Sequence, residues 1–255
     1  MPDLADLGVA LVRADNPGPF TLSGTNTWVV GRDPAWVVDP GPALPGHVEA
    51  VAAEVDARGG AGGIAITHDH EDHVEGVPAL RERLGRPPVG AMRYPADVAL
   101  DDGDAFGPLR AVAIPGHAPD HLAFVAGEAC CTGDAVLGEG SVFVAGELAG
   151  YLAALERLRE LPLRAICPGH GPPVWRPREK LEEYLAHRRE RERRLIAALE
   201  AGLRDDDELL DAVWDDAPPA LRGAAAVTLR AHLEKLREEG RLPPPGGAAP
   251  GTSPR

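Results

Sequence analysis

The sequence is poor in cysteine, methionine and aromatic residues, with three cysteines, two methionines and 4% aromatic residues in a chain of 255. No Cys-x-x-Cys spacing occurs, which excludes the common thiol metal site and redox pair. Cys130 and Cys131 are adjacent in an apolar run, and neighbours in a strand point to opposite faces, so we expect no disulfide between them. Together with Cys167, they are predicted to be small core residues.

Long apolar runs and a basic N-terminal segment are also missing. No stretch approaches the roughly 20 consecutive apolar residues that span a membrane, and the N-terminus lacks a basic segment followed by an apolar one. We therefore expect a cytoplasmic protein with no membrane partner. The formal net charge of −14 disfavours nucleic acid in general, although a local basic patch could override it. A homo-oligomer is compatible with this composition, which leaves the oligomeric state open.

Short runs rich in branched and aromatic residues predict strands, and the segments between them carry helical periodicity. This order predicts an α/β domain in which helices cover sheets. The expected helices of this part are 45–58, 77–84 and 148–161. The expected strands are 27–30, 35–38, 63–67, 109–114, 122–125, 129–132 and 164–167.

After residue 175 the pattern becomes wholly helical. Helices are expected at 178–201, at 207–214 with Asp205 or Asp206 as N-cap, and at 220–239 with Gly240 as C-cap. The sequence therefore predicts an α/β domain at 1–175, a small helical domain at 176–242 and a disordered tail at 243–255.

Three histidines and an aspartate stand within six residues, directly after an apolar run: His68, His70, Asp72 and His73. Imidazole nitrogens and carboxylate oxygens are the ligands of catalytic zinc sites. In a loop, the first two residues can converge on one metal while the last two reach a second. The alternative is a solvated acidic loop, but three close histidines around an aspartate gain nothing from solvation alone.

Three further candidate ligands each follow an apolar run through a turn that contains glycine. They are His117 in Ile-Pro-Gly-His, Asp134 in Cys-Thr-Gly-Asp and His170 in Cys-Pro-Gly-His-Gly. Glycine allows the backbone to approach an ion closely. Each residue alone would be an ordinary loop residue, but the repeated order of strand and then ligand predicts a shared metal site.

In this order the motifs resemble the metallo-β-lactamase superfamily over residues 20–175. The resemblance implies a four-layer αββα sandwich, followed here by the helical domain, with two metals at one edge. It implies that His68, His70 and His117 bind one metal, that Asp72, His73 and His170 bind the other, and that Asp134 bridges them. Asp39, in Val-Val-Asp-Pro-Gly, then either supports the metal loops from behind or is a simple turn residue.

A closer resemblance is to the lactamase-β-like subfamily, and it rests on the segments 24–31, 133–140 and 187–192. The resemblance implies a C-terminal winged-helix domain. Animal mitochondrial members of that subfamily are single-strand endoribonucleases, and most bacterial members are known only as hydrolases. This chain departs from the pattern at Val74-Glu75-Gly76, which places a carboxylate near the site, and in a wing that is cut short after Leu242.

We expect two divalent metal ions, zinc foremost, whose shared hydroxide attacks a carbonyl carbon or a phosphorus while Asp72 orients it. The main hypothesis is hydrolysis of an ester or thioester of a small acyl substrate. The alternative is an endoribonuclease that cleaves single-stranded RNA with the same site. A third hypothesis, a DNA-binding domain beside a relic metal domain, has weak electrostatic support in the helix 220–239. β-Lactam hydrolysis is disfavoured, because the β-lactam hydrolases of the superfamily are exported and lack a bridging aspartate, whereas this chain has Asp134 and no expected export signal.

The RNA hypothesis depends on eight basic residues between Arg176 and Arg194. The simpler interpretation is a helix whose charges pair with each other, for example Glu190 with Arg194. Of the remaining histidines, His47, His187 and His232 are predicted to lie on the surface. His121 is four residues after His117, and either a hydrogen-bonding or a catalytic role is open to it.

Overall fold

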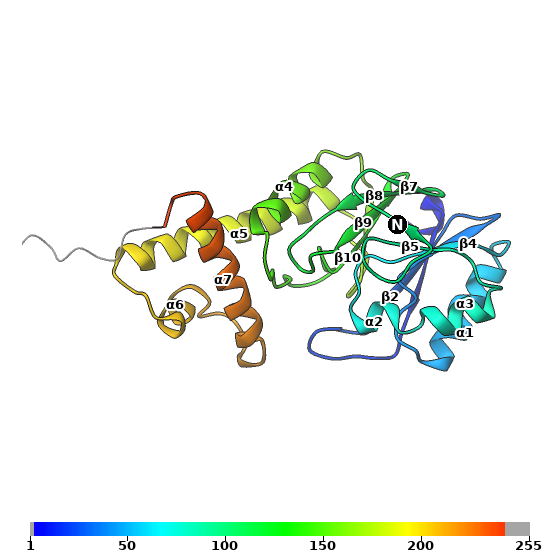
Figure 1. Cartoon of the computed structure of the whole chain (residues 1–255), viewed down its shortest axis with the longest axis horizontal. Helices are drawn as coiled ribbons and strands as arrows, with labels where there is room; N and C mark the ends of the chain where they lie inside the picture. The colour runs from blue at the N-terminus through cyan, green and yellow to red at the C-terminus, as the bar shows by residue number, and fades with distance from the viewer. Residues whose placement is uncertain (1–2, 243–255) are drawn as a thin grey trace, which may run out of the picture.

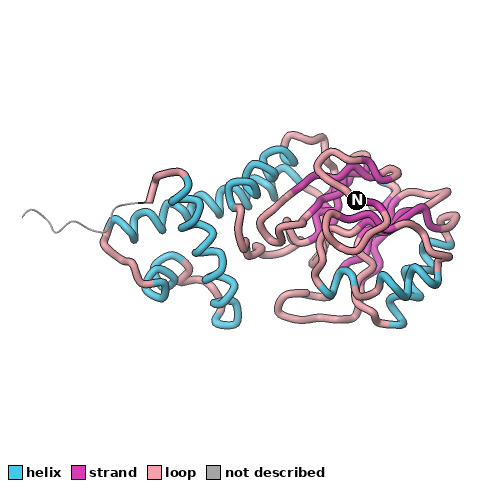
Figure 2. Tube along the Cα trace, viewed as in Figure 1, coloured by secondary structure: helices cyan, strands magenta, loops and turns pink. Residues whose placement is uncertain are grey.

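The computed structural model describes residues 3–242. Figure 1 shows a body rich in strands, joined by one long helix to a smaller group of helices. Figure 2 shows the same division, with the strands gathered in the first body and only helices and loops in the second. The expected disordered tail, 243–255, lies outside the described residues.

The first body contains two sheets. The six-stranded sheet has the order β1-β2-β3-β4-β5-β6, and the five-stranded sheet has the order β11-β10-β9-β8-β7. The first consists of β1 (Val9–Arg13), β2 (Asn26–Val30), β3 (Ala35–Val38), β4 (Ala61–Ala65), β5 (Val89–Ala91) and β6 (Val98–Ala99). The second consists of β7 (Ala105–Phe106), β8 (Leu109–Ala113), β9 (Leu122–Ala126), β10 (Ala129–Gly133) and β11 (Ala165–Pro168).

Helices make three of the four parallel connections of the two sheets. β3, β4, β5 and β6 pair in parallel, and α1 (Pro45–Asp56) and α3 (Val77–Arg83) lie in the connections from β3 to β4 and from β4 to β5. α4 (Leu148–Arg159) connects the parallel pair β10 and β11. The loops that follow β4, β8, β10 and β11 carry the residues discussed in the next section.

Alternation along the strands separates three apolar layers. Trp28 and Val30 point into the core between the two sheets, whereas Val29 points to the outer face, where α1 and α3 cover it. Cys130 and Cys131 divide in the same way between the outer and inner cores of the second sheet, and all three cysteines are buried and free. The layers therefore run helix, sheet, sheet, helix, as the family resemblance implied.

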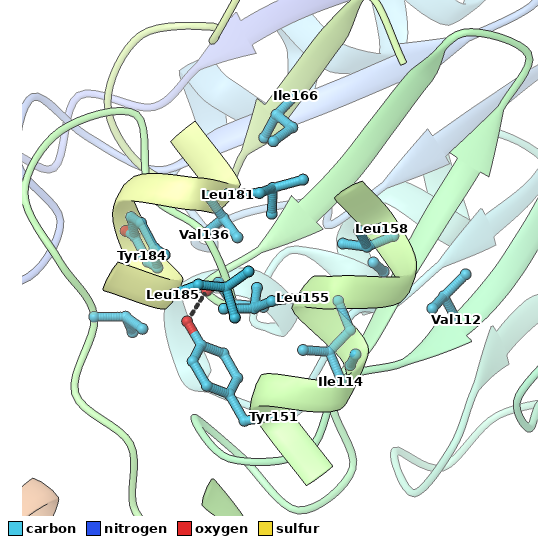
Figure 3. Close-up of a cluster of buried hydrophobic side chains, with 14 of the residues drawn as sticks. Val112, Ile114, Val136, Tyr151, Leu155, Leu158, Ile166, Leu181, Tyr184 and Leu185 are labelled. Atoms are coloured by element: carbon cyan, nitrogen blue, oxygen red, sulfur yellow. Dashed lines mark hydrogen bonds between the residues drawn. The ribbon is translucent and has the colours of Figure 1, made fainter. Parts of the chain in front are cut away.

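The outer face of the second sheet is covered by α4 and by the first half of α5 (Pro177–Glu200). Figure 3 shows this cluster, in which Tyr151, Leu155 and Leu158 of α4 meet Leu181 and Leu185 of α5. The buried hydroxyl of Tyr151 donates a hydrogen bond of 2.7 Å to the carbonyl of Ala135. The polar end of this side chain is therefore satisfied within an apolar cluster.

The second body is built around the second half of α5. Leu195 and Leu199 of α5 pack with α6 (Asp206–Val213) and α7 (Arg222–Glu238), which follows a short turn of helix, η2 (Pro219–Leu221). Asp205 caps α6 by accepting hydrogen bonds from the backbone N–H groups of residues 207 and 208. Within residues 176–242, all regular elements are helical. α5 thus contributes to the cores of both bodies.

The sequence located the longer elements and missed four strands. β1, β5, β6 and β7 were not predicted, because β5, β6 and β7 span only two or three residues and β1 follows a polar start without clear alternation. The remaining elements are the short α2 (Glu71–Val74) and η1 (Ala5–Leu7). No helix among residues 3–242 is long and apolar enough to cross a bilayer.

Two of the three histidines that were expected on the surface are buried, and this prediction was wrong. His47 is 5% exposed and its Nε2 lies 2.9 Å from Thr27 Oγ1, and His232 is fully buried beside Trp214. His187 is half-buried. The error arose because the sequence of a helix of mixed polarity does not reveal which of its polar side chains a neighbouring strand, loop or helix will cover.

Leu155→Ala tests the contribution of the outer core. The side chain is fully buried between α4 and the second sheet, so its loss should lower the free energy of unfolding by about 2–5 kcal/mol. Leu152→Ala, at a half-buried position of the same helix, should lower the free energy of unfolding clearly less than Leu155→Ala does. Denaturant unfolding monitored by circular dichroism measures both, and equal losses would contradict this packing.

His232 should make the second body sensitive to acid. Burial, aided by the cations Arg188 and Lys235, lowers the pKa of His232 to about 3. Between pH 6.5 and about 3 the unfolded chain binds a proton that the folded chain excludes. As the pH is lowered through this range, the free energy of unfolding therefore decreases by up to about 1.4 kcal/mol per pH unit. His232→Phe should flatten that part of the pH profile of thermal unfolding. An unchanged slope would show that His232 is not buried as a neutral ring.

Candidate metal centre

The loop after β4 supplies four of the candidate ligands. The strand ends at Ala65, and the chain then turns across the end of the sheet until α2 begins at Glu71. His68 and His73 are buried, while His70 and Asp72 are partly open to solvent. The short helix places Asp72 and His73 on its first turn, so that both reach toward the end of the neighbouring sheet.

The structure brings all seven predicted ligands together in two adjacent groups. In each group the potential ligand atoms lie within 4.8 Å of one another. The first group is His68, His70, His117 and Asp134, and the second is Asp72, His73 and His170. This division is the one that the family resemblance implied, including the pairing of His117 with the first two histidines.

Asp134 lies between the two groups. Its Oδ2 is 3.6 Å from His117 Nε2 in the first group, while its Oδ1 is 3.5 Å from His73 Nε2 and 3.3 Å from His170 Nε2 in the second. One carboxylate oxygen thus faces each group, which is the geometry that a bridging ligand requires. Asp72 belongs to the second group alone, with Oδ2 3.3 Å from His170 Nε2.

Hydrogen bonds behind the histidines decide which ring nitrogen faces inward. Asp39 Oδ2 is 3.0 Å from His73 Nδ1, and the carbonyl of Phe143 is 3.4 Å from His117 Nδ1. A carboxylate or carbonyl only accepts, so each Nδ1 carries the proton and each Nε2 keeps its lone pair for the centre. His70 differs, because its Nδ1 points inward, 3.0 Å from Nε2 of His68 and 3.1 Å from Nε2 of His117.

Asp39 connects both groups and is not merely a turn residue. It accepts hydrogen bonds from the backbone N–H of Thr67 at 2.8 Å, from the Thr67 hydroxyl at 2.7 Å and from His73. Because the Thr67 hydroxyl donates to Asp39, it must accept from His68 Nδ1, 2.9 Å away. One buried carboxylate therefore orients a histidine of each group. Its backbone has φ +53°, a left-handed conformation that aspartate tolerates better than most residues.

Two positioning residues were missed by the sequence analysis. Thr25 Oγ1 donates to Asp72 Oδ2 at 2.8 Å, which fixes the more exposed carboxylate. Asn26 Nδ2 donates to the carbonyls of Pro168 and Gly171, at 3.0 and 2.8 Å, and so holds the loop on both sides of His170. A signal was present, because both residues lie in the segment 24–31 that carries the subfamily resemblance.

His121 has a positioning role in this structure. Its Nε2 accepts a hydrogen bond of 3.1 Å from the backbone N–H of Asp134, and its ring stacks on that of His68 with centroids 4.7 Å apart. The residue is buried, and it supports one ligand from each of two loops. Of the two roles that the sequence left open, hydrogen bonding is the one observed.

Burial and charge divide the site electrostatically. Burial, together with the neighbouring His73, holds the pKa of His68 well below its usual range, and burial lowers the pKa of His117 to about 4. The first group therefore offers neutral rings with free lone pairs. Burial also disfavours the charged form of His73, but Asp134 and Asp39 outweigh it and raise the pKa of His73 to about 9. The second group is thus a place where positive charge is stabilised.

The residues fit a pair of cations. Nε2 of His73 and Oδ1 of Asp134 are buried and have no hydrogen-bond partner among the described residues, although buried polar atoms are normally paired. A Cβ added at Gly169 would lie 2.4 Å from Asp134 Oδ1 and 2.8 Å from the His73 ring, so any larger residue would intrude on the site. Imidazole and carboxylate donors in this number suit divalent transition metals.

A cavity of about 450 Å³ opens at the centre and extends toward the second body. Its inner end includes His117 and Asp134, and its far side is formed by Trp214, Leu221 and other residues of the helical body. The loop between β1 and β2 contributes Phe20, which is 58% exposed. In Figure 1 this loop reaches from the sandwich toward the lower end of α7. A volume of this size is typical of small-molecule sites.

A two-sheet sandwich with this cluster at one end defines the class of metallo-β-lactamase-fold proteins. A family model described as "Beta-lactamase associated winged helix domain" matches residues 207–242. The solved structure of a metallo-beta-lactamase family protein from Thermus thermophilus superposes with a TM-score of 0.72 at 25% identity, covering 91% of this chain and 94% of that one.

Two relatives are similar in sequence as well. The "Beta-lactamase-like protein 2 homolog" of Caenorhabditis elegans is 32% identical over 91% of this chain and 85% of its own length. The "Atrochrysone carboxyl ACP thioesterase" of a Cryptosporiopsis species is 33% identical over 75% of this chain and 63% of its own length. The chain therefore belongs to the metallo-β-lactamase superfamily of hydrolases, in the β-lactamase-like family with a C-terminal winged-helix domain.

Asp39→Asn tests the support behind the ligands. Asparagine keeps the size and tolerates the left-handed backbone, but it has only one acceptor oxygen. The carboxylate now accepts at both oxygens, from the Thr67 backbone N–H at Oδ1 and from the Thr67 hydroxyl and His73 at Oδ2, so the amide NH2 must face a donor at one of these two positions. Zinc affinity, measured by competition with a chromophoric chelator, should fall about 10–100-fold. Asp69→Asn, at an exposed position of the same ligand loop, is the matched control. Equal affinities of the two variants would contradict the role of Asp39.

Proposed function

We propose that this hydrolase cleaves an ester or thioester of a small acyl group, with two divalent metal ions, zinc foremost, held by the seven side chains of the two groups. The observation that carries this proposal is the cavity that leads from His117 and Asp134 along mostly apolar side chains. Such a cavity suits the apolar part of an acyl substrate whose carbonyl lies at the metal centre.

Bound divalent cations would supply Lewis-acid polarisation of the substrate carbonyl and make a water molecule nucleophilic near neutral pH. The remaining chemistry belongs to the chain's own residues. Asp72 is the most exposed carboxylate of the cluster and is fixed by Thr25, so it is placed to orient the attacking water and to hold its proton. The water oxygen bonds to the carbonyl carbon, the bond to the ester oxygen or thiol sulfur breaks, and the leaving group departs with that proton.

The charges of α5 favour an acyl substrate over RNA. Seven of the eight basic residues between Arg176 and Arg194 form an ion pair with a carboxylate, so the helix does not present a row of free cations. The expected pair Glu190 with Arg194 is replaced: Glu190 pairs with Arg193, and Arg194 pairs with Asp215. The similarity to a thioesterase points the same way.

The third hypothesis, a DNA-binding role of α7, has little support from this structure. Lys235 of this helix is buried and pairs with Glu192 at 2.6 Å and with Glu239 at 3.0 Å. His232 is buried as well. These side chains serve the packing between α5 and α7, so they are not available to a groove of DNA.

The proposal is tested with metal-loaded protein on a panel of S-lactoylglutathione, an acyl thioester, a lactone, bis-p-nitrophenyl phosphate and single-stranded RNA. We expect turnover of the acyl substrates. His70→Ala and Asp134→Ala should abolish it and reduce the metal content measured by mass spectrometry, because each removes a ligand of the first group. Glu71→Ala, exposed in the same loop, should retain activity.

Two outcomes would contradict the proposal. Cleavage of RNA alone would favour the endoribonuclease hypothesis and overturn the acyl one. Normal turnover by the His70 or Asp134 variants would show that the ligand assignment is wrong, whichever substrate is cleaved.

A further inference from the structure

Arg188 is the one basic residue of the 176–194 segment that has no acidic partner among the described residues. It is also the most deeply buried, with 2% of its surface exposed. Its Nη2 donates to the Ser141 hydroxyl at 3.1 Å and to the carbonyl of Val142, and its guanidinium lies 6.0 Å from the centre of the Tyr151 ring. All of these partners are neutral. Within the described part of the chain, its Nε has no hydrogen-bond partner.

A buried cation without a counter-ion is unfavourable, because desolvation of the charge is not offset by a nearby anion. The other buried arginine of α5 shows the usual solution. Arg191 is 6% exposed and makes two hydrogen bonds of 2.7 Å to the carboxylate of Asp216. That carboxylate is therefore already paired. Glu139, which also lines the cavity, is exposed and forms no ion pair with Arg188.

The cavity connects Arg188 with the metal centre. Both Arg188 and His117 line it, and they are linked through one short loop, since Val142 contacts Arg188 and the ring of the next residue, Phe143, lies 4.7 Å from that of His117. The apolar part of the lining comes from Phe20, Leu22, Leu137, Val142, Trp214 and Leu221. A ligand that fills this space therefore meets two residues of the metal centre, apolar side chains and a guanidinium in one cavity.

We propose that the cavity receives an acyl group whose far end carries a carboxylate, and that Arg188 binds this carboxylate. This inference rests on the proposed acyl hydrolysis and names its substrate class as an apolar chain or ring system with a terminal acid. A guanidinium pairs well with a carboxylate because its planar N–H groups match the two oxygens. Arg188, which α5 holds against residues 141–142, then selects the substrate while the loops at the end of the sandwich supply the reacting centre.

The first test measures binding to the metal-loaded protein by isothermal titration calorimetry. The probes are the dicarboxylates from succinate to sebacate, each paired with the monocarboxylate of equal chain length. Both members of a pair offer one carboxylate to the metals, so their difference reports the far end. At the chain length that spans the cavity, the dicarboxylate should bind about 10–100-fold more tightly than its partner.

Arg188→Met should remove this difference without changing the affinity for the monocarboxylate, because methionine keeps an unbranched apolar chain in the same space. Arg189→Met is the matched control, since Arg189 is exposed and pairs with Glu156. If Arg188→Met does not fold, Arg188→Lys keeps a cation and should leave a smaller preference for the dicarboxylate. A parallel loss for both probes would indicate a purely structural arginine and would overturn the proposal. So would the absence of any preference in the wild type.

The second test separates an anion on the acyl group from one on the leaving group. Thioesters of ω-carboxyacyl and plain acyl chains are compared with two thiols, the neutral N-acetylcysteamine and the anionic coenzyme A. We expect kcat/KM to be higher for the ω-carboxyacyl thioester than for the plain acyl thioester, whichever thiol is the leaving group. A higher kcat/KM for the coenzyme A thioesters than for the N-acetylcysteamine thioesters, with no effect of the acyl carboxylate, would overturn the proposal. If neither these thioesters nor the acyl substrates of the earlier panel are cleaved, the proposed function fails, while the calorimetric comparison still decides the role of Arg188.

Discussion

The structure depends on one electrostatic constraint: seven histidine and aspartate side chains from four loops, all candidate metal ligands, share one mostly buried space at the end of the sandwich. Three ring nitrogens meet within about hydrogen-bonding distance in the first group, and the unpartnered Nε2 of His73 and Oδ1 of Asp134 face each other in the second. Such a set of lone pairs and carboxylates is stabilised by cations and by little else. The networks around Asp39, Thr25 and His121 are best understood as the framework that holds this set in place.

The two bodies contribute different parts of the site. The sandwich aligns the ends of β4, β8, β10 and β11, and the loop after each of these strands supplies a candidate ligand, so the candidate centre is positioned by the packed sheets. The described part of the helical body contributes no candidate ligand to either group, yet it forms part of the wall of the cavity that leads to them. Because α5 packs into both cores, it couples the position of that wall to the sandwich.

Much of the centre was predictable, because its candidate ligands lie in short sequence motifs that can be recognised one at a time. Histidines and aspartates that follow apolar strands through glycine turns leave a pattern in the sequence, and the family resemblance assigned them to their two groups. The supporting residues were less visible. Thr25 and Asn26 act on ligands more than 45 residues away in the chain, as the hydrogen bonds to Asp72 and Pro168 show, and no local pattern encodes such a contact. The same reason explains the buried His232 and Arg188, which a helix taken alone presents as ordinary polar residues.

The central claim is that the two groups hold two cations, and anomalous X-ray diffraction from crystals grown with zinc tests it most directly. Data collected on both sides of the zinc absorption edge locate the metal independently of any assumed ligand. The account predicts two anomalous peaks in each chain, one among His68, His70 and His117 and one among Asp72, His73 and His170, with Asp134 between them. A single peak elsewhere, or none within the cluster at saturating zinc, would contradict it.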